Sequence, residues 1–253
     1  MQGLLPLIIG LLLLSGAGPA WSADEPTLGQ RLQLWPEWQL PAPLPRPGRH
    51  SDLVYPSWFE GEWTVSSMAL DRLDDDSSPL EHKARFIRRG GAVVGDRAFN
   101  AIAVGQAVLG STLLTVEQPE REPNRQLARL RGDRLLETTV IGRRQSDPNR
   151  SDFVSEFLSD ELVLQILHGP EAPRISRVET LSRYQPCAPA SRERICADQW
   201  QARYSGPDTG LNRSPESVHR YRLELTRLQD RSASAGPPTD PSNGTNLGGG
   251  DGH

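Results

Sequence analysis

Short segments in which apolar and polar side chains alternate dominate this sequence, and each of them ends at turn residues. The segment 217–229 is the clearest example. One of its faces carries ring and apolar side chains, at His219, Tyr221, Leu223 and Leu225. A period of two residues is typical of a β-strand with one buried face. Comparable segments occupy 58–70, 82–89, 111–118, 125–132, 134–144, 152–168, 174–186 and 195–206.

The regions between the clearest strands decide the topology that we expect. Gly132-Asp133 predicts a tight turn between two of the strands, and 152–168 is long enough for two strands. Residues 92–110 contain small apolar side chains that suit a short helix, but their glycines favour bent strands or a loop.

A set of short strands without an internal repeat or a strong helical pattern indicates a meandering antiparallel sheet. Closing such a sheet into a barrel removes the exposed edges that it would otherwise leave. We therefore predict an all-β protein with a single antiparallel β-barrel over residues 51–229. A two-sheet sandwich is the alternative.

Both flanks of this domain have a different composition. Residues 230–253 have almost no apolar side chains and cannot offset the entropy cost of ordering, so we expect a disordered tail. Residues 23–50 form a Pro-rich arm, whose closely spaced prolines favour polyproline II and exclude a central strand. Its Trp35, Trp38 and Leu40 either pack on the barrel wall, which is the simpler interpretation, or offer a surface to a partner.

The N-terminus and the two cysteines indicate an exported protein. Residues 1–22 resemble a signal peptide, with an apolar run over 4–14 followed by small residues. No Lys or Arg precedes that run, which leaves an uncleaved anchor as an alternative. Cys187 and Cys196 flank a short loop, and in an oxidising compartment we expect them to form a disulfide, worth roughly 2–3 kcal/mol.

Several classes of function are disfavoured. The net charge of −4 is spread along the chain without a basic stripe, which argues against a nucleic-acid partner. The five histidines are isolated, and no nucleophile elbow or phosphate-binding glycine loop is present, so we expect no enzyme, metal site or cofactor. His219 could ligate a haem iron inside a barrel, but a core histidine with satisfied hydrogen bonds is the simpler interpretation.

The motif Gly61-Glu62-Trp63 resembles the Gly-x-Trp signature of the lipocalins and their calycin relatives. The resemblance implies a tryptophan that lies across the closed end of the barrel, beneath an arginine from the last strand. Arg222 and Arg227 are the candidates for that arginine, which would make a cation–π contact. The glycine would let another backbone approach closely.

A longer succession of blocks, from "DLVYPSWFEGEWTVSS" through "GDRAFN", "ETTVIGRR" and "QWQARY" to "YRLEL", spans residues 52 to 225. It resembles an uncharacterised family shared by cyanobacteria and plant plastids. The resemblance implies export to the thylakoid lumen or the periplasm, and it implies no known activity.

The block "GDRAFN" contains the densest polar pair, Arg97 and Asn100. These two side chains could hold an acidic group of a ligand at the barrel mouth. Alternatively, Asp96 could form a hydrogen bond with Arg97 or Asn100 in a turn that has only a structural role. Arg85 and Tyr221, together with Arg125 and Gln199, are further candidates to line the interior.

Two functions follow from these observations. The first is lipocalin-like binding of a small apolar or amphipathic molecule such as a lipid, carotenoid or tetrapyrrole. The second is a non-enzymatic assembly or interaction factor of the photosynthetic membrane, with a filled barrel and a thylakoid membrane protein as its partner. A cavity larger than roughly 300 Å³ favours the first function.

Overall fold

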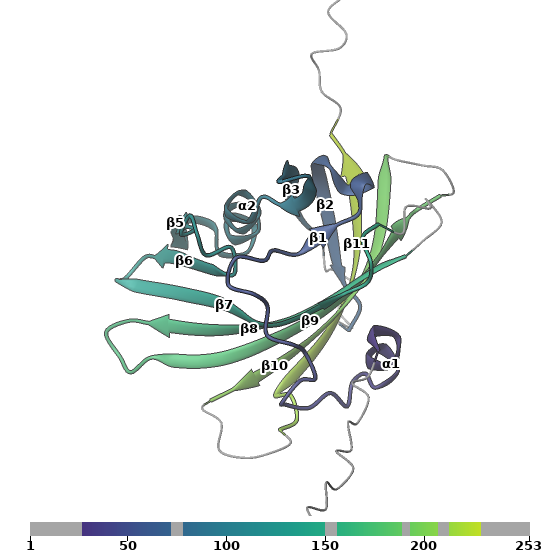
Figure 1. Cartoon of the computed structure of the whole chain (residues 1–253). Helices are drawn as coiled ribbons and strands as arrows, with labels where there is room; N and C mark the ends of the chain where they lie inside the picture. Colours follow the sequence, from purple (N-terminus) through teal and green to yellow (C-terminus); the bar gives the residue numbers. More distant parts are fainter. Residues whose placement is uncertain (1–26, 72–77, 150–155, 189–192, 207–212, 229–253) are drawn as a thin grey trace, which may run out of the picture.

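The computed structural model describes residues 27–71, 78–149, 156–188, 193–206 and 213–228 (Figure 1). The predicted signal peptide and C-terminal tail lie outside these residues. The strands are β1 (Val54–Tyr55), β2 (Gly61–Ala69), β3 (Leu80–Arg89), β4 (Ala92–Gly95), β5 (Leu113–Glu117), β6 (Arg125–Leu130), β7 (Arg134–Gln145), β8 (Phe157–His168), β9 (Arg174–Pro186), β10 (Arg194–Ser205) and β11 (Ser217–Arg227). The helices are α1 (Leu28–Gln33) and α2 (Arg97–Leu109), with short 3₁₀ turns η1 (Ser57–Phe59) and η2 (Gly110–Thr112). None of the described helices has the length and apolar character needed to cross a membrane.

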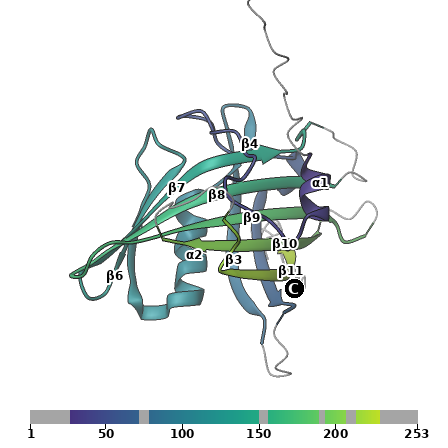
Figure 2. The same cartoon turned by 90° about the horizontal axis from the view of Figure 1, so that it is seen from below.

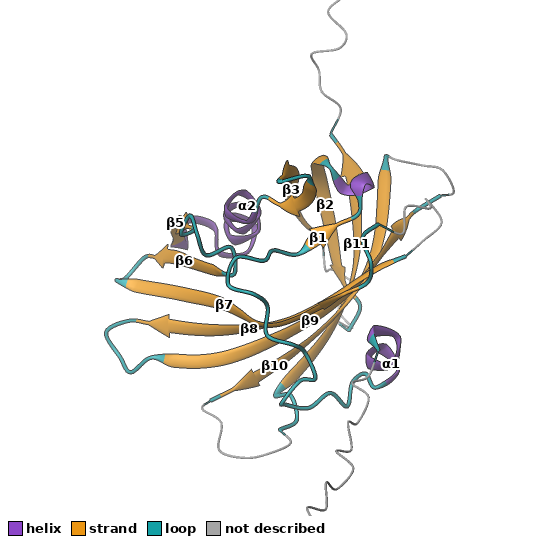
Figure 3. Ribbon diagram, viewed as in Figure 1, coloured by secondary structure: helices purple, strands orange, loops and turns teal. Residues whose placement is uncertain are grey.

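All eleven strands form one antiparallel sheet in the order β1-β4-β3-β2-β11-β10-β9-β8-β7-β6-β5. The predicted antiparallel all-β architecture is therefore confirmed at this level. The sheet curls into a half-barrel and is not closed, because β1 and β5 remain as its two edges (Figures 1 and 3). Helix α2 lies in the opening and contacts β3 on one side and β5 on the other. It stands where strand pairing would have to continue for the barrel to close.

The favoured interpretation of 92–110 as bent strands or a loop was wrong. Only β4 is extended, and α2 follows it directly. Asp96 caps the helix by accepting a hydrogen bond from the backbone N–H of Phe99 at 3.3 Å. Alanine has the highest helix propensity and outweighs the single internal glycine, while Gly110, with φ of 53°, ends the helix.

Two further expectations concern turns and strand lengths. Gly132 and Asp133 have positive φ, of 75° and 50°, in the three-residue connection between the paired residues Leu130 and Arg134, so the tight turn is confirmed. The region 152–168 contains one strand, β8, and no second strand among its described residues. The pairing of β8 with both β7 and β9 from Ser159 to Leu167 explains why one long strand is preferred.

An aromatic core at one end of the concave side contains the tryptophan of the Gly-x-Trp motif. Its largest members come from η1 and from strands on both sides of the half-barrel: Trp58, Phe59, Trp63, Phe86 and Phe157. Trp63 is fully buried and donates from Nε1 to the carbonyl of Phe59 at 2.7 Å.

Arg227, and not Arg222, lies over this tryptophan, with its guanidinium carbon 4.3 Å from the ring centroid. Strand alternation decides between the two, since Arg222 is one position out of phase and its side chain is 67% exposed. Gly61 has φ of 129°, and a Cβ there would lie 2.6 Å from Nη1 of Arg227. The glycine therefore makes room for a side chain rather than for the neighbouring backbone that we expected.

A second core lies on the convex face of the sheet, under the N-terminal arm (Figures 1 and 2). Trp38 and Leu40 of the arm are buried there against strand residues such as Leu181 and Trp200, and Trp35 packs at the edge of the cluster. The expectation that the arm packs on the wall is confirmed. The arm is not entirely extended, because α1 begins at a capping box formed by Thr27 and Gln30.

Candidate ligand-binding groove

Helix α2 is loosely covered although it is largely apolar. Apart from Arg97, Asn100 and Gln106, each of its residues is apolar or glycine, yet none of them is buried. The face toward the concave side of the sheet carries small and apolar residues at helical spacing: Ala101, Val104, Gly105 and Val108. Val108 is 61% exposed. The helix thus faces the sheet without packing tightly against it.

Three adjoining cavities fill the space between α2 and the sheet. The first, of about 440 Å³, lies beside the aromatic core, and the second, of about 460 Å³, shares Ala101, Val104 and Gln126 with it. The third, of about 290 Å³, shares Leu109 and Gln165 with the second. Together they form one groove along α2, which is about 20 Å long at 1.5 Å per residue. We call this space the groove, and its end beside the aromatic core the deep end.

Charged groups at the deep end are paired with each other. Arg97 binds Asp52 at 2.6 Å and Glu161 at 3.2 Å. Arg143 donates to the same Glu161 at 2.7 Å and to Asn124 at 2.7 Å. Burial acts to raise the pKa of Glu161, but the two guanidinium groups outweigh it and lower that pKa below its usual range. The carboxylates of Asp52 and Glu161 therefore balance the guanidinium groups of Arg97 and Arg143.

Two tyrosines complete the deep end. Tyr55 and Tyr184 both line the first cavity. Burial, together with nearby negative charge, raises the pKa of each phenol. Both tyrosines stay neutral across the physiological range, and they present ring faces and hydroxyl groups rather than charge.

Asn100 lines the first cavity, but its amide is engaged with the sheet. Its Oδ1 accepts from the backbone N–H of Arg85 at 2.7 Å, and its Nδ2 donates to the carbonyl of Arg85 at 3.0 Å. These bonds continue the β3–β4 ladder beyond Gly95, where β4 ends. Arg97 and Asn100 are thus brought together at the groove, and each already has partners within the protein.

The other sequence candidates lie elsewhere, except Gln199, which lines the first cavity. Arg85 pairs with Glu62 at 2.8 Å and covers the ring of Phe99, and Arg125 pairs with Glu137. Tyr221 contacts His219, at 6.2 Å between ring centroids, and is not among the groove residues.

His219 is not the core histidine that we expected. Its Nδ1 lies 2.7 Å from Asp71, and its side chain is 43% exposed. Its register partner Gln201 lines the groove, so alternation placed His219 on the correct face of the sheet, but at a position that the core does not cover.

Sequence reasoning missed Glu161 and Gln126, which lie on inward positions of β8 and β6. The available signal for Glu161 was its phase, because it shares a strand face with Val163. That face also carries Ser159 and Gln165, so it is not uniformly apolar and its signal for a buried ion pair was weak.

A second buried charge cluster lies on the convex face, under α1. Arg31 reaches between Asp160 and Glu179, and it contacts the Glu179 carboxylate directly and Asp160 at 3.9 Å. Tyr204 donates to Glu179 at 3.2 Å. Burial raises the pKa of both carboxyl groups, and for Asp160 the neighbouring Glu179 raises it further. One guanidinium therefore serves two buried carboxyl groups.

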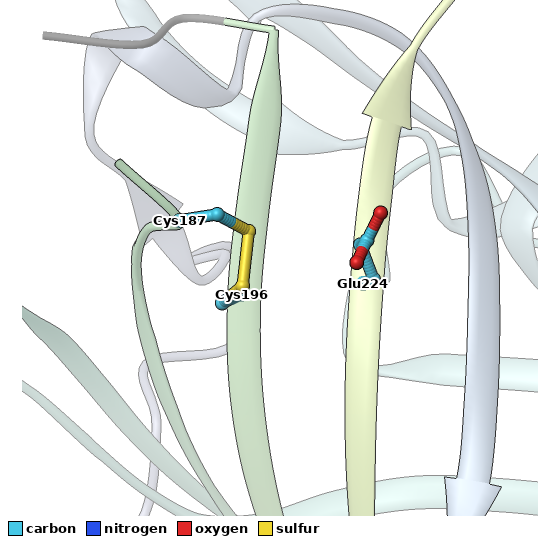
Figure 4. Close-up of side chains that lie close together, drawn as sticks. All are labelled: Cys187, Cys196 and Glu224. Atoms are coloured by element: carbon cyan, nitrogen blue, oxygen red, sulfur yellow. A yellow bond between two sulfur atoms is a disulfide. The ribbon is translucent and has the colours of Figure 1, made fainter. Parts of the chain in front are cut away.

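Cys187 and Cys196 form a disulfide, as expected, with their Cα atoms 4.9 Å apart (Figure 4). Glu224 lies beside the bridge on β11. The two sulfur atoms are bonded to each other and Glu224 is paired with Arg194. These three residues therefore do not offer a metal site while the bridge is intact.

Comparison with known proteins gives a family but no function. A family described as a domain of unknown function (DUF6816) matches residues 47–229, which is more than half of the chain. No curated protein matches the chain, and no solved structure matches it. The expectation of an uncharacterised family is confirmed.

Proposed function

Since the chain belongs to this family of unknown function, its role has to be inferred from the groove, and we propose that it binds a small apolar or amphipathic molecule there. The observation that carries this proposal is α2, an apolar helix without a buried residue that borders cavities of about 440 and 460 Å³. Both volumes fall in the range of ligand sites, which begins at roughly 300 Å³.

The energetic argument concerns the side chains that α2 leaves uncovered. Val104, Val108 and Leu109 are 38%, 61% and 39% exposed. Covering an exposed aliphatic side chain completely contributes about 1.5–3 kcal/mol, so an apolar ligand would gain part of this at each position. Gln201 lines the second cavity and could orient a polar group of that ligand.

A lipid, a carotenoid or a tetrapyrrole has the apolar surface that such a groove accepts. The alternative function required a filled barrel and an exposed arm. The groove is hollow, and Trp38 and Leu40 of the arm are buried on the convex face. We therefore retain only the binding function.

We also propose that the protein is exported, to the thylakoid lumen or the periplasm. The signal-like residues 1–22 and the Cys187–Cys196 disulfide support this location. Intact mass of protein fractionated from cells would test it, since cleavage near residue 22 is expected only after export.

A fluorescence titration with Nile red, a neutral apolar probe, tests the binding function. We expect saturable binding to the wild-type protein and loss of binding in Ala101→Trp, because Ala101 lines both large cavities and an indole there fills the groove. Gln106→Trp is the matched control, since Gln106 is exposed and is not a groove residue. Absence of saturable binding to the wild type, or equal binding by both variants, would overturn the proposal.

A further inference from the structure

Two arginines stand at the end of the groove opposite the aromatic core. Arg174 of β9 and Arg203 of β10 both line the third cavity, together with apolar residues such as Leu109 and Leu167. Arg203 has the same strand phase as Gln199 and Gln201, and Arg174 the same phase as Ser176, so alternation directs both toward the concave side.

No acidic side chain is among the described residues that line this third cavity. Neither Arg174 nor Arg203 has an ion-pair partner within the described part of the chain. The deep end differs in this respect, because Arg97 is compensated there by Asp52 and Glu161. The groove therefore has one internally neutralised end and one end with two uncompensated positive charges.

We propose that the natural ligand is a long-chain anionic amphiphile. Its carboxylate or phosphate group would bind Arg174 and Arg203, and its chain would extend along α2 toward the deep end. This inference rests on the proposed binding function and adds the charge and the orientation of the ligand.

The chemistry of the two ends supports this orientation. Guanidinium groups bind carboxylate and phosphate through charge-assisted, often bidentate hydrogen bonds. Between the arginines and the deep end, the groove is lined by aliphatic side chains such as Val104, Val116 and Leu136, with glutamine amides among them. Its length of about 20 Å along a 13-residue helix is sufficient for an extended long acyl chain.

Displacement of bound Nile red by three ligands of equal chain length tests the inference. Palmitate carries a carboxylate, hexadecyl phosphate carries a phosphate, and hexadecanol is neutral. We expect at least one of the anions to displace the probe at about tenfold lower concentration than hexadecanol, a modest ratio because both arginines are exposed. A preference for only one anion would identify the headgroup.

The double variant Arg174→Gln/Arg203→Gln should lose this preference and still bind hexadecanol. Arg222→Gln is the matched control, because Arg222 is exposed and has the opposite strand phase to the inward residues of β11. In the wild type the preference for the anion should also shrink with rising ionic strength, a measurement that needs no variant.

The two proposals fail in different ways. Equal displacement by palmitate, hexadecyl phosphate and hexadecanol would overturn the anionic headgroup while leaving the binding function intact. A wild-type protein that binds neither Nile red nor hexadecanol would overturn the binding function itself. Persistence of the preference in the double variant would show that the two arginines are not the anchor.

Discussion

Replacing Arg31 with methionine should destabilise the protein strongly, because the substitution removes the cation that contacts both buried carboxyl groups on the convex face. Asp160 and Glu179 have fully buried side chains, and that of Arg31 is 4% exposed. Removing one partner from a buried ion pair costs about 3–5 kcal/mol, since the remaining charge stays without compensation. We expect a loss of this size at neutral pH.

The arm could avoid this cost only by leaving the convex face. Undocking would expose Leu28, Trp38 and Leu40, which are at least nine-tenths buried. Each of these side chains contributes about 1.5–3 kcal/mol through burial, so undocking costs at least as much as keeping the arm in place. The loss should also shrink as the pH falls, because the raised pKa values of Asp160 and Glu179 allow both groups to become neutral.

Urea unfolding followed by tryptophan fluorescence measures the change, and limited proteolysis reports whether the arm stays docked. Arg46→Met is the matched control in the same arm, where an exposed arginine should cost no more than about 0.5 kcal/mol. Combining Arg31→Met with Asp160→Asn and Glu179→Gln should recover most of the loss. A single variant within about 1 kcal/mol of the wild type, with a protected arm, would refute the reasoning.

Three further predictions concern other parts of the fold. Arg227→Ala should lower the free energy of unfolding by about 2–4 kcal/mol, because it removes two charge-assisted hydrogen bonds to backbone carbonyls and a cation–π contact. Arg222→Ala should change it by no more than about 0.5 kcal/mol. Similar losses in the two variants would contradict the assignment of Arg227 as the arginine over Trp63. Intact-mass analysis after non-reducing alkylation should find no free thiol at Cys187 or Cys196, and serine at both positions should cost roughly 2–3 kcal/mol in urea unfolding. Asp160→Asn should raise the urea midpoint of unfolding at neutral pH. It should also flatten the gain in stability that we expect for the wild type as the pH falls toward about 4, because Asp160 binds a proton in the folded protein at a pH where the unfolded chain has released it. An unchanged dependence of stability on pH would contradict this prediction.

Alternation predicted the strands well because most of them bury one face along much of their length. The same rule could have selected Arg227 over Arg222, since Leu225 is buried and lies two positions before Arg227. The helix α2 was missed although its signals are local. Asp96 at the N-cap and the run of alanines favour a helix, but the glycines received more weight than the helix propensity supports.

Other features depend on residues that are distant in sequence, and no local pattern indicates them. Arg31 and Glu179 are 148 positions apart, and each read alone suggests an exposed charge. The open edge of the sheet likewise depends on where α2 packs after the chain has folded. The empty volume of the groove depends on the combined side-chain volumes of several strands, and the periodicity of a single strand does not measure these.

The two faces of the sheet are covered in different ways, and this difference bears on how the groove should be interpreted. On the convex face the arm buries Trp38 and Leu40 and satisfies two carboxyl groups with Arg31, so that even an irregular segment packs closely. The arm covers only part of that face, since Arg222 on the same side is 67% exposed, but where it docks the packing is close. On the concave face the chain places an apolar helix at a distance that leaves no residue of that helix buried. A general inability to pack would affect both faces, whereas a space kept for a ligand affects only the face where the ligand lies. The contrast therefore favours a binding site over a packing defect.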